Sequence, residues 1–136
     1  MPKSLKDLVA DAKSRIRELT AGDAEEAIRN NPKILVLDVR EPGEYAQEHL
    51  PGALNVPRGV LEAKADLEYA AREPRLADRS QPIITHCASG ARSAFAADVL
   101  QLMGFTDVRS MAGGIQAWKA LGLPTERSST QTVPAG

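Results

Sequence analysis

The stretch Ile83–Ala94, with the sequence IITHCASGARSA, carries the pattern of a strand, a loop and a helix in direct succession. Its first residues are branched and apolar, which is typical of a strand buried on both faces of a sheet. Four small residues then separate Cys87 from Arg92, and the apolar spacing beyond them predicts a helix over residues 91–103. A strand that leads through a tight loop into a helix favours a parallel sheet covered by helices.

The same alternation continues along the rest of the chain. Short apolar runs predict the strands, and apolar residues at helical spacing predict the helices between them. The predicted strands cover residues 16–19, 34–39, 53–56, 82–86 and 107–111. The predicted helices cover residues 4–14, 24–30, 60–72, 91–103 and 115–121. Alternating strands and helices indicate an α/β layered fold.

The two ends of the chain differ from its middle. Residues 1–19 predict an amphipathic helix and a short strand that lead into the domain, and the domain itself is expected to span residues 20–124. Residues 125–136 have no apolar periodicity, and we expect them to form a mobile C-terminal tail.

The composition of the 136 residues suits one ordinary globular domain. Lys and Arg, 17 in all, nearly balance the 18 Asp and Glu, so the global basic field that favours nucleic-acid binding is missing. No segment has the apolar length of a membrane span or a signal-peptide core, so we expect a cytoplasmic protein with no membrane partner. One Cys and two His make a metal centre improbable, and we expect no cofactor.

The loop after residue 86 has the features of a reactive cysteine site. Cys87 stands at the carboxyl end of a predicted strand, where open α/β sheets place their ligands. The small residues after it let backbone N–H groups converge at a helix N-terminus, and Gly90 can adopt the positive φ that such a curl needs. These donors and the charge of Arg92 would lower the pKa of the thiol and attract an anionic substrate. A lone Cys is otherwise a small buried hydrophobe, but this context favours a nucleophile. The candidate residues are Cys87, Ala88, Ser89, Gly90, Ala91 and Arg92.

Four segments, taken in order, resemble the motifs of the rhodanese family. They are LDVREPGEY at 37–45, EHLPGA at 48–53, CASGAR at 87–92 and GGIQAW at 113–118. The resemblance covers roughly residues 20–124. It implies a single rhodanese-like domain with a central, mostly parallel five-stranded sheet, helices on both faces and an active loop that closes over Cys87.

The resemblance also implies the reaction of a thiosulfate sulfurtransferase. A sulfane sulfur would pass from a donor such as thiosulfate onto Cys87, and then from the persulfide to a thiol or a small sulfur-carrier protein. There is no second Cys to resolve the persulfide, so its release must depend on an external acceptor. The near-neutral charge permits a monomer or a homodimer.

Three charged residues lie close to the implied site. The resemblance places Asp38 and Arg40 near the active loop, in a supporting role. Two residues apart on one strand they share a face, so a structural ion pair is expected. Arg58 would lie at the pocket mouth, where it either guides an anion or is an ordinary solvated residue.

Three further side chains could have functional roles, but packing roles are favoured for all of them. His49 precedes a Pro-Gly turn, and a thiolate nucleophile needs no general base. His86 should point to the face opposite Cys87 and pack in the core. Trp118 lies on a late helix, where a lone aromatic side chain usually packs between helix and sheet.

Two other functions compete with sulfur transfer. Phosphatases and arsenate reductases also use a Cys in an anion cradle closed by an Arg, but their loop holds five residues between the two, whereas only four separate Cys87 from Arg92. The chain could also be a persulfide carrier without turnover, or a regulatory rhodanese-like binding module.

Overall fold

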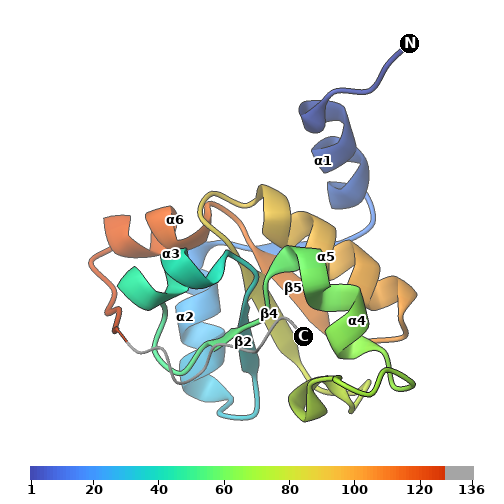
Figure 1. Cartoon of the computed structure of the whole chain (residues 1–136). Coiled ribbons are helices and arrows are strands. Elements are labelled where there is room, and N and C mark those ends of the chain that lie inside the picture. The colour runs from blue at the N-terminus through green and yellow to red at the C-terminus, as the bar shows by residue number, and fades with distance from the viewer. Residues whose placement is uncertain (128–136) are drawn as a thin grey trace.

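A computed structural model describes residues 1–127 of the chain as an α/β fold built on one five-stranded sheet (Figure 1). The strands follow the spatial order β1-β5-β4-β2-β3, and every neighbouring pair is parallel, so the predicted mostly parallel sheet is fully parallel. The strands are β1 (Arg17–Leu19), β2 (Leu35–Asp38), β3 (Leu54–Asn55), β4 (Ile83–His86) and β5 (Val108–Met111). The α-helices are α1 (Leu5–Lys13), α2 (Ala21–Asn30), α3 (Pro42–Gln47), α4 (Leu61–Ala65), α5 (Ala91–Leu102) and α6 (Gly114–Ala120).

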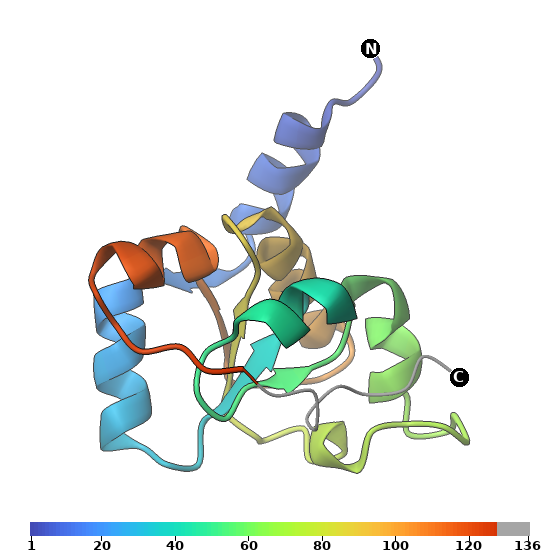
Figure 2. The same ribbon diagram turned by 60° about the vertical axis from the view of Figure 1, so that its left-hand side comes forward.

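Helices cover both faces of this sheet, as predicted. The side chains of β2 alternate between two cores: Leu35 and Leu37 pack on the side of α4 and α5, and Val36 packs on the side of α2, α3 and α6. Figures 1 and 2 show the two helical layers with the sheet between them. Because β2 and β4 are buried along their whole length, both strands have the continuous apolar runs seen in the sequence.

The helix predicted over residues 60–72 is shorter in the structure. A 3-10 turn, η1 (Arg58–Val60), leads into α4, which ends at Ala65. The guanidinium of Arg79 donates to the backbone oxygen of Ala65 at 2.7 Å and to that of Leu76 at 2.8 Å. The bond to Ala65 satisfies a carbonyl that a longer helix would use itself, and the chain continues instead through a second 3-10 turn, η2 (Pro74–Leu76).

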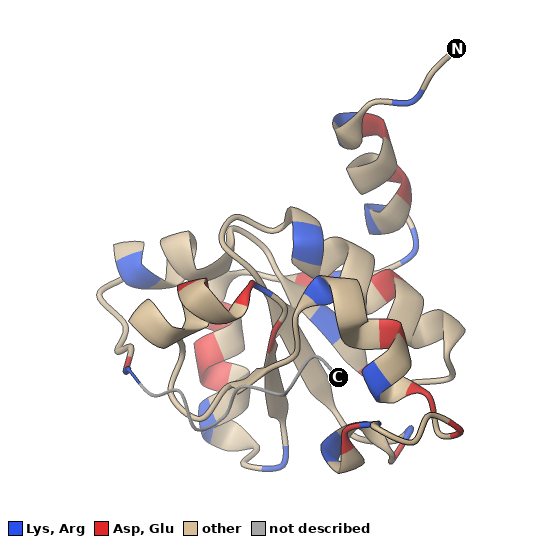
Figure 3. Ribbon diagram, in the orientation of Figure 1, with Lys and Arg blue, Asp and Glu red and all other residues tan. Residues whose placement is uncertain are grey.

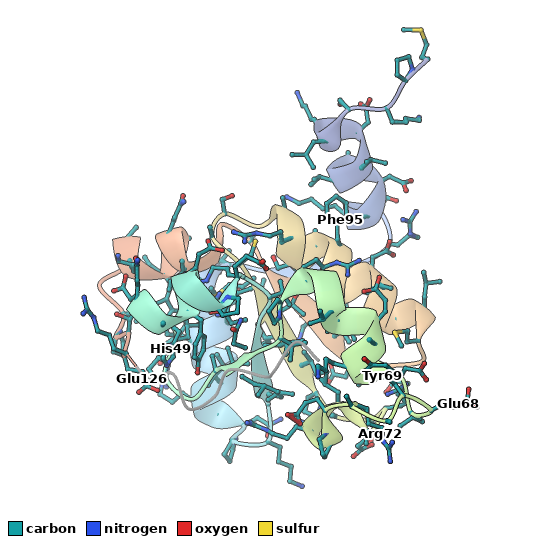
Figure 4. All side chains as sticks on the ribbon, viewed as in Figure 1. His49, Glu68, Tyr69, Arg72, Phe95 and Glu126 are labelled. Carbon is teal, nitrogen blue, oxygen red and sulfur yellow. The ribbon has the colours of Figure 1, made fainter. Side chains whose placement is uncertain are left out.

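The N-terminal helix α1 projects from the body of the domain (Figures 1 and 2). A capping box between Ser4 and Asp7 starts it, and its C-terminal part packs against α5, close to Phe95 (Figure 4). None of the helices within residues 1–127 is long and apolar enough to cross a bilayer.

The predicted mobile tail does not begin at Thr125. Glu126 and His49 exchange two backbone hydrogen bonds, of 3.0 and 2.9 Å, and so form an antiparallel bridge that fixes this part of the chain (Figure 4). The remainder of the predicted tail, residues 128–136, lies outside the described residues.

Candidate active site

The candidate site is the loop that connects β4 to α5. Cys87 follows the last residue of β4, and Gly90 is the N-cap of α5 with a φ of +116°. This left-handed conformation, which the sequence analysis anticipated for Gly90, turns the backbone so that the Gly90 N–H donates to the Cys87 Sγ at 3.1 Å. The sulfur is therefore held by the main chain of its own loop.

Hydroxyl groups linked by hydrogen bonds lie next to the Cys87 sulfur. The Ser93 Oγ is 3.6 Å from the Cys87 Sγ, and the Ser110 hydroxyl donates to the Ser93 Oγ at 2.9 Å. The Thr85 hydroxyl fixes the same turn of α5 by donating to the Ser93 backbone oxygen at 3.0 Å. Sequence reasoning gave Ser93 no role. The position of Ser93, three residues beyond Gly90 in the first turn of the helix, could have indicated that its hydroxyl lies near the loop.

The surroundings of the Cys87 thiol act on its pKa in two directions. Burial is the largest influence and raises the pKa, since Cys87 is only 1% exposed. The Ser93 hydroxyl and the backbone amides of Ser93, Gly90 and Ser89 act in the opposite direction by hydrogen bonding to the sulfur. Together these donors outweigh burial, so the pKa of Cys87 lies below that of an ordinary thiol.

The first residues of α6 donate hydrogen bonds to the backbone of the Cys87 loop. The Ile115 N–H donates to the Cys87 backbone oxygen at 2.9 Å, and the Gln116 N–H donates to that of Ala88 at 3.2 Å. Gly114 has a φ of +57°, and a Cβ there would lie 2.3 Å from the Cys87 backbone oxygen. The GGIQAW segment therefore requires Gly at this position so that α6 can approach the Cys87 loop.

Arg92 differs from the expectation that its charge is available to an anionic substrate. Its guanidinium donates to both carboxylate oxygens of Glu44 on α3, at 2.7 and 3.1 Å. Hydrogen bonding between the two side chains is the largest influence on both, and it lowers the pKa of Glu44 and raises that of Arg92. Both are therefore ionised at neutral pH. Sequence reasoning missed Glu44, which lies 48 positions from Arg92.

Asp38 and Arg40 form the predicted ion pair. Arg40 Nη2 lies 2.8 Å from Asp38 Oδ2, and it also donates to the Glu48 backbone oxygen at 2.6 Å. Both side chains are nearly inaccessible, with exposed fractions of 7% for Arg40 and 0% for Asp38. The His86 Nε2 is 3.6 Å from Asp38 Oδ2, and burial lowers the pKa of His86 despite this carboxylate, which raises it. His86 is thus the predicted core residue.

The remaining candidates lie outside the loop. Arg58 is half-buried and pairs with Glu62 one turn later, at 2.7 Å, so the structure gives it a local partner. His49 stacks on the Tyr45 ring with centroids 3.8 Å apart, which fits the predicted packing role. Trp118 also packs as predicted, and its indole N–H donates to the Pro124 backbone oxygen at 2.8 Å.

Comparison with known proteins identifies the family of this fold and loop. A model of the rhodanese-like domain matches residues 20–121. The chain belongs to this family. Among its relatives, "Thiosulfate sulfurtransferase 16, chloroplastic" of Arabidopsis thaliana is 40% identical over 93 residues, which are 66% of this chain and 78% of the relative.

Two further relatives carry different names. A Bacillus subtilis protein called a putative sulfur carrier is 29% identical over 105 residues, which are 77% of this chain and 52% of the relative. A solved structure from Rhodopseudomonas palustris, titled as a protein of unknown function and possible tyrosine phosphatase, superposes with a TM-score of 0.85. It is 31% identical, and the match covers 93% of this chain and 96% of that one. The chain is thus similar to proteins whose names describe different activities.

Proposed function

We propose that the chain is a sulfurtransferase that carries sulfane sulfur as a persulfide on Cys87. The observation that carries this proposal is the arrangement of polar groups around the sulfur. The Gly90 N–H donates to it at 3.1 Å, and the Ser93 hydroxyl, at 3.6 Å, can donate to it once the thiol is ionised. Donors of this kind favour a thiolate, which is the nucleophilic form of a Cys. The backbone amides of the loop can also stabilise negative charge on an outer sulfur.

The reaction takes place in two displacements. The Cys87 thiolate attacks the outer sulfur of a donor such as thiosulfate, a new S–S bond forms, and sulfite leaves with the electrons of the broken S–S bond. An acceptor thiolate, from a small thiol or a sulfur-carrier protein, then attacks the outer sulfur of the persulfide. Cys87 departs as a thiolate and is ready for the next cycle. No net oxidation occurs at Cys87 over the cycle.

A phosphatase activity receives less support from the site. A phosphoryl dianion would depend on the Arg92 guanidinium, and Glu44 already binds it with two hydrogen bonds. The loop also places only four residues between Cys87 and Arg92. A cradle of this size fits a single sulfur atom better than a tetrahedral phosphoryl group.

Intact-mass spectrometry and turnover together test the proposal. The wild-type protein, treated with thiosulfate, is expected to gain the mass of one sulfur and to lose it to a thiol acceptor. The Cys87→Ser variant should show neither effect while keeping its circular dichroism spectrum. A wild-type protein that never gains sulfur from any sulfane donor would refute the proposal. If each protein molecule delivered only one sulfur to the acceptor, the chain would instead be a persulfide carrier without turnover.

A further inference from the structure

The three arginines named as candidates around the loop share one feature: each is bound to a carboxylate. The pairs are Arg92–Glu44, Arg40–Asp38 and Arg58–Glu62, with N–O distances of 2.7, 2.8 and 2.7 Å. The formal charge of each pair is zero. Figure 3 shows positions of Lys and Arg interspersed with positions of Asp and Glu along the ribbon of residues 1–127. The three paired arginines therefore provide little net positive charge.

The position of Glu44 does not depend on Arg92 alone. Glu44 is the third residue of α3, and its Oε1 accepts a hydrogen bond from the Glu41 N–H at 3.0 Å. The Glu44 backbone N–H in turn donates to the Glu41 backbone oxygen at 3.0 Å. The hydrogen bond from the Glu41 N–H therefore fixes the Glu44 carboxylate at the start of α3 before any substrate arrives. The pair with Arg92 is therefore preorganised by the local sequence of α3.

The Arg92–Glu44 pair is more exposed to solvent than the Arg40–Asp38 pair. The side chains of Arg92 and Glu44 are 36% and 37% exposed, whereas those of Arg40 and Asp38 are almost fully buried. Arg92 also senses the charge of Cys87, since the Cys87 thiolate contributes to the raised pKa of Arg92 after the larger effects of Glu44 and burial. A donor that approaches Cys87 would thus meet a partly exposed guanidinium whose charge Glu44 has already neutralised.

The sulfur itself is held mainly by neutral donors, namely backbone amides and the Ser93 hydroxyl. Such donors suit the single negative charge of a thiolate or a persulfide. Thiosulfate brings a second negative charge on its sulfonate end, and that charge would need a free cation beside the loop. A persulfide of a small thiol, R–S–SH, brings at most one charge when its R group is neutral.

We propose that Glu44 is a specificity-determining residue that neutralises Arg92 and thereby favours small-thiol persulfides over thiosulfate as sulfur donors. This inference rests on the proposed function of Cys87. In the favoured reaction the Cys87 thiolate attacks the outer sulfur of R–S–SH. The Cys87–sulfur bond forms, the S–S bond of the donor breaks, and the thiolate RS⁻ leaves with its electron pair. The proton stays with the transferred sulfur or passes to the leaving thiolate.

The test compares two donors in a set of charge variants. The donors are thiosulfate and an alkyl persulfide with an uncharged alkyl group. Glu44→Gln keeps an oxygen that can accept the Glu41 N–H but removes the negative charge. We expect the KM for thiosulfate to fall about three- to tenfold in this variant, with kcat within about twofold, and the KM for the alkyl persulfide to stay within about twofold. Glu25→Gln, which removes the same charge from the Arg29 pair on α2, is the matched control and should change neither KM.

Two further variants separate charge from structure. Arg92→Gln leaves Glu44 uncompensated, so the KM for thiosulfate should rise, in the direction opposite to Glu44→Gln. The double variant, which is neutral like the native pair, should return the ratio of the two donors' kcat/KM values towards that of the wild type. A purely structural role for the pair would instead make both single variants and the double variant worse with both donors.

The outcomes distinguish this inference from the proposed function. An unchanged thiosulfate KM in Glu44→Gln, or an equal change for both donors, would overturn the role of Glu44 while Cys87 still gained sulfur. Failure of both donors to add sulfur to Cys87 in every variant would overturn the proposed function itself. If Glu44→Gln did not fold, the thiosulfate KM of Arg92→Gln would decide, because a KM that did not rise would contradict the charge argument.

Discussion

Replacing Ser93 by Ala tests whether side-chain hydrogen bonding lowers the pKa of Cys87. Ser93 is fully buried, and its hydroxyl is the side-chain group that lies 3.6 Å from the Cys87 Sγ. When the thiol is protonated, its S–H donates to the Ser93 Oγ. After ionisation the hydroxyl can turn and donate to the thiolate, while the Gly90 N–H continues to donate. The Ser93→Ala variant loses the first of these donors and keeps the second.

The expected size of the effect follows from the kind of bond that is lost. A hydrogen bond to a charged group contributes about 1.5 kcal/mol at the lower end of its range, and the long contact to sulfur justifies that end. Since about 1.4 kcal/mol corresponds to a factor of ten, the acid dissociation constant of the Cys87 thiol should be about tenfold smaller in the variant. At pH values below the pKa of both proteins, the rate of sulfur loading from a fixed donor should fall in the same proportion.

Alkylation by iodoacetamide as a function of pH measures this change directly. Ser93→Ala should react about tenfold more slowly than the wild type at pH values below the pKa of both proteins, and at a similar rate at high pH, where both are ionised. The high-pH plateau also reports access to the buried sulfur. Ser110→Ala removes the bond to Ser93 but no contact to Cys87, so its profile should stay close to that of the wild type. Identical profiles for Ser93→Ala and the wild type would refute the reasoning.

Three other predictions concern the support of the loop and the pH dependence of the fold. Gly114→Ala should abolish sulfur loading and lower the free energy of unfolding by about 2 kcal/mol or more, because its Cβ would collide with the loop backbone. In Gly43→Ala the new Cβ meets no atom within 4 Å, so this control should keep the stability measured by urea unfolding and the sulfur loading measured by mass spectrometry. Asp38→Asn should destabilise the domain by about 3 kcal/mol in urea unfolding, because Arg40 is left buried without its counter-charge; a loss below 1 kcal/mol would contradict this. The pKa of His86 is lowered in the folded protein, so its contribution to stability is present above pH 6.5 and is lost below it. Between pH 7.5 and 5.5 the free energy of unfolding of the wild type should therefore fall by about 1 kcal/mol more than that of His86→Asn. Equal losses in the two proteins would exclude this effect.

The parts of the fold that the sequence predicted correctly are those with a local cause. Strands β2 and β4 are buried on both faces, and this burial leaves a continuous apolar run that can be recognised from the sequence. The helix predicted over residues 60–72 was too long because the residue that closes α4, Arg79, lies 14 positions beyond Ala65. No periodicity within the segment could show that contact.

The same distinction applies to the candidate site. The role of the Cys87 loop could be predicted because its strand, its small residues and the start of its helix are adjacent in the sequence. The pairing of Arg92 with Glu44 joins α5 to α3 across 48 positions, so only the folded chain shows that the charge is neutralised. Ser93 occupied a recognisable place in the first turn of α5, but its contact with the sulfur depends on how the loop folds back.

Transfer of a labelled sulfur atom tests the central claim most directly. Thiosulfate labelled with a heavy isotope at its outer sulfur is mixed with the protein, and the peptide that contains Cys87 is analysed by mass spectrometry before and after addition of a thiol acceptor. We expect one labelled sulfur on Cys87, followed by its appearance in the acceptor. Acceptor that becomes labelled while Cys87 never carries the isotope would contradict a persulfide at this residue.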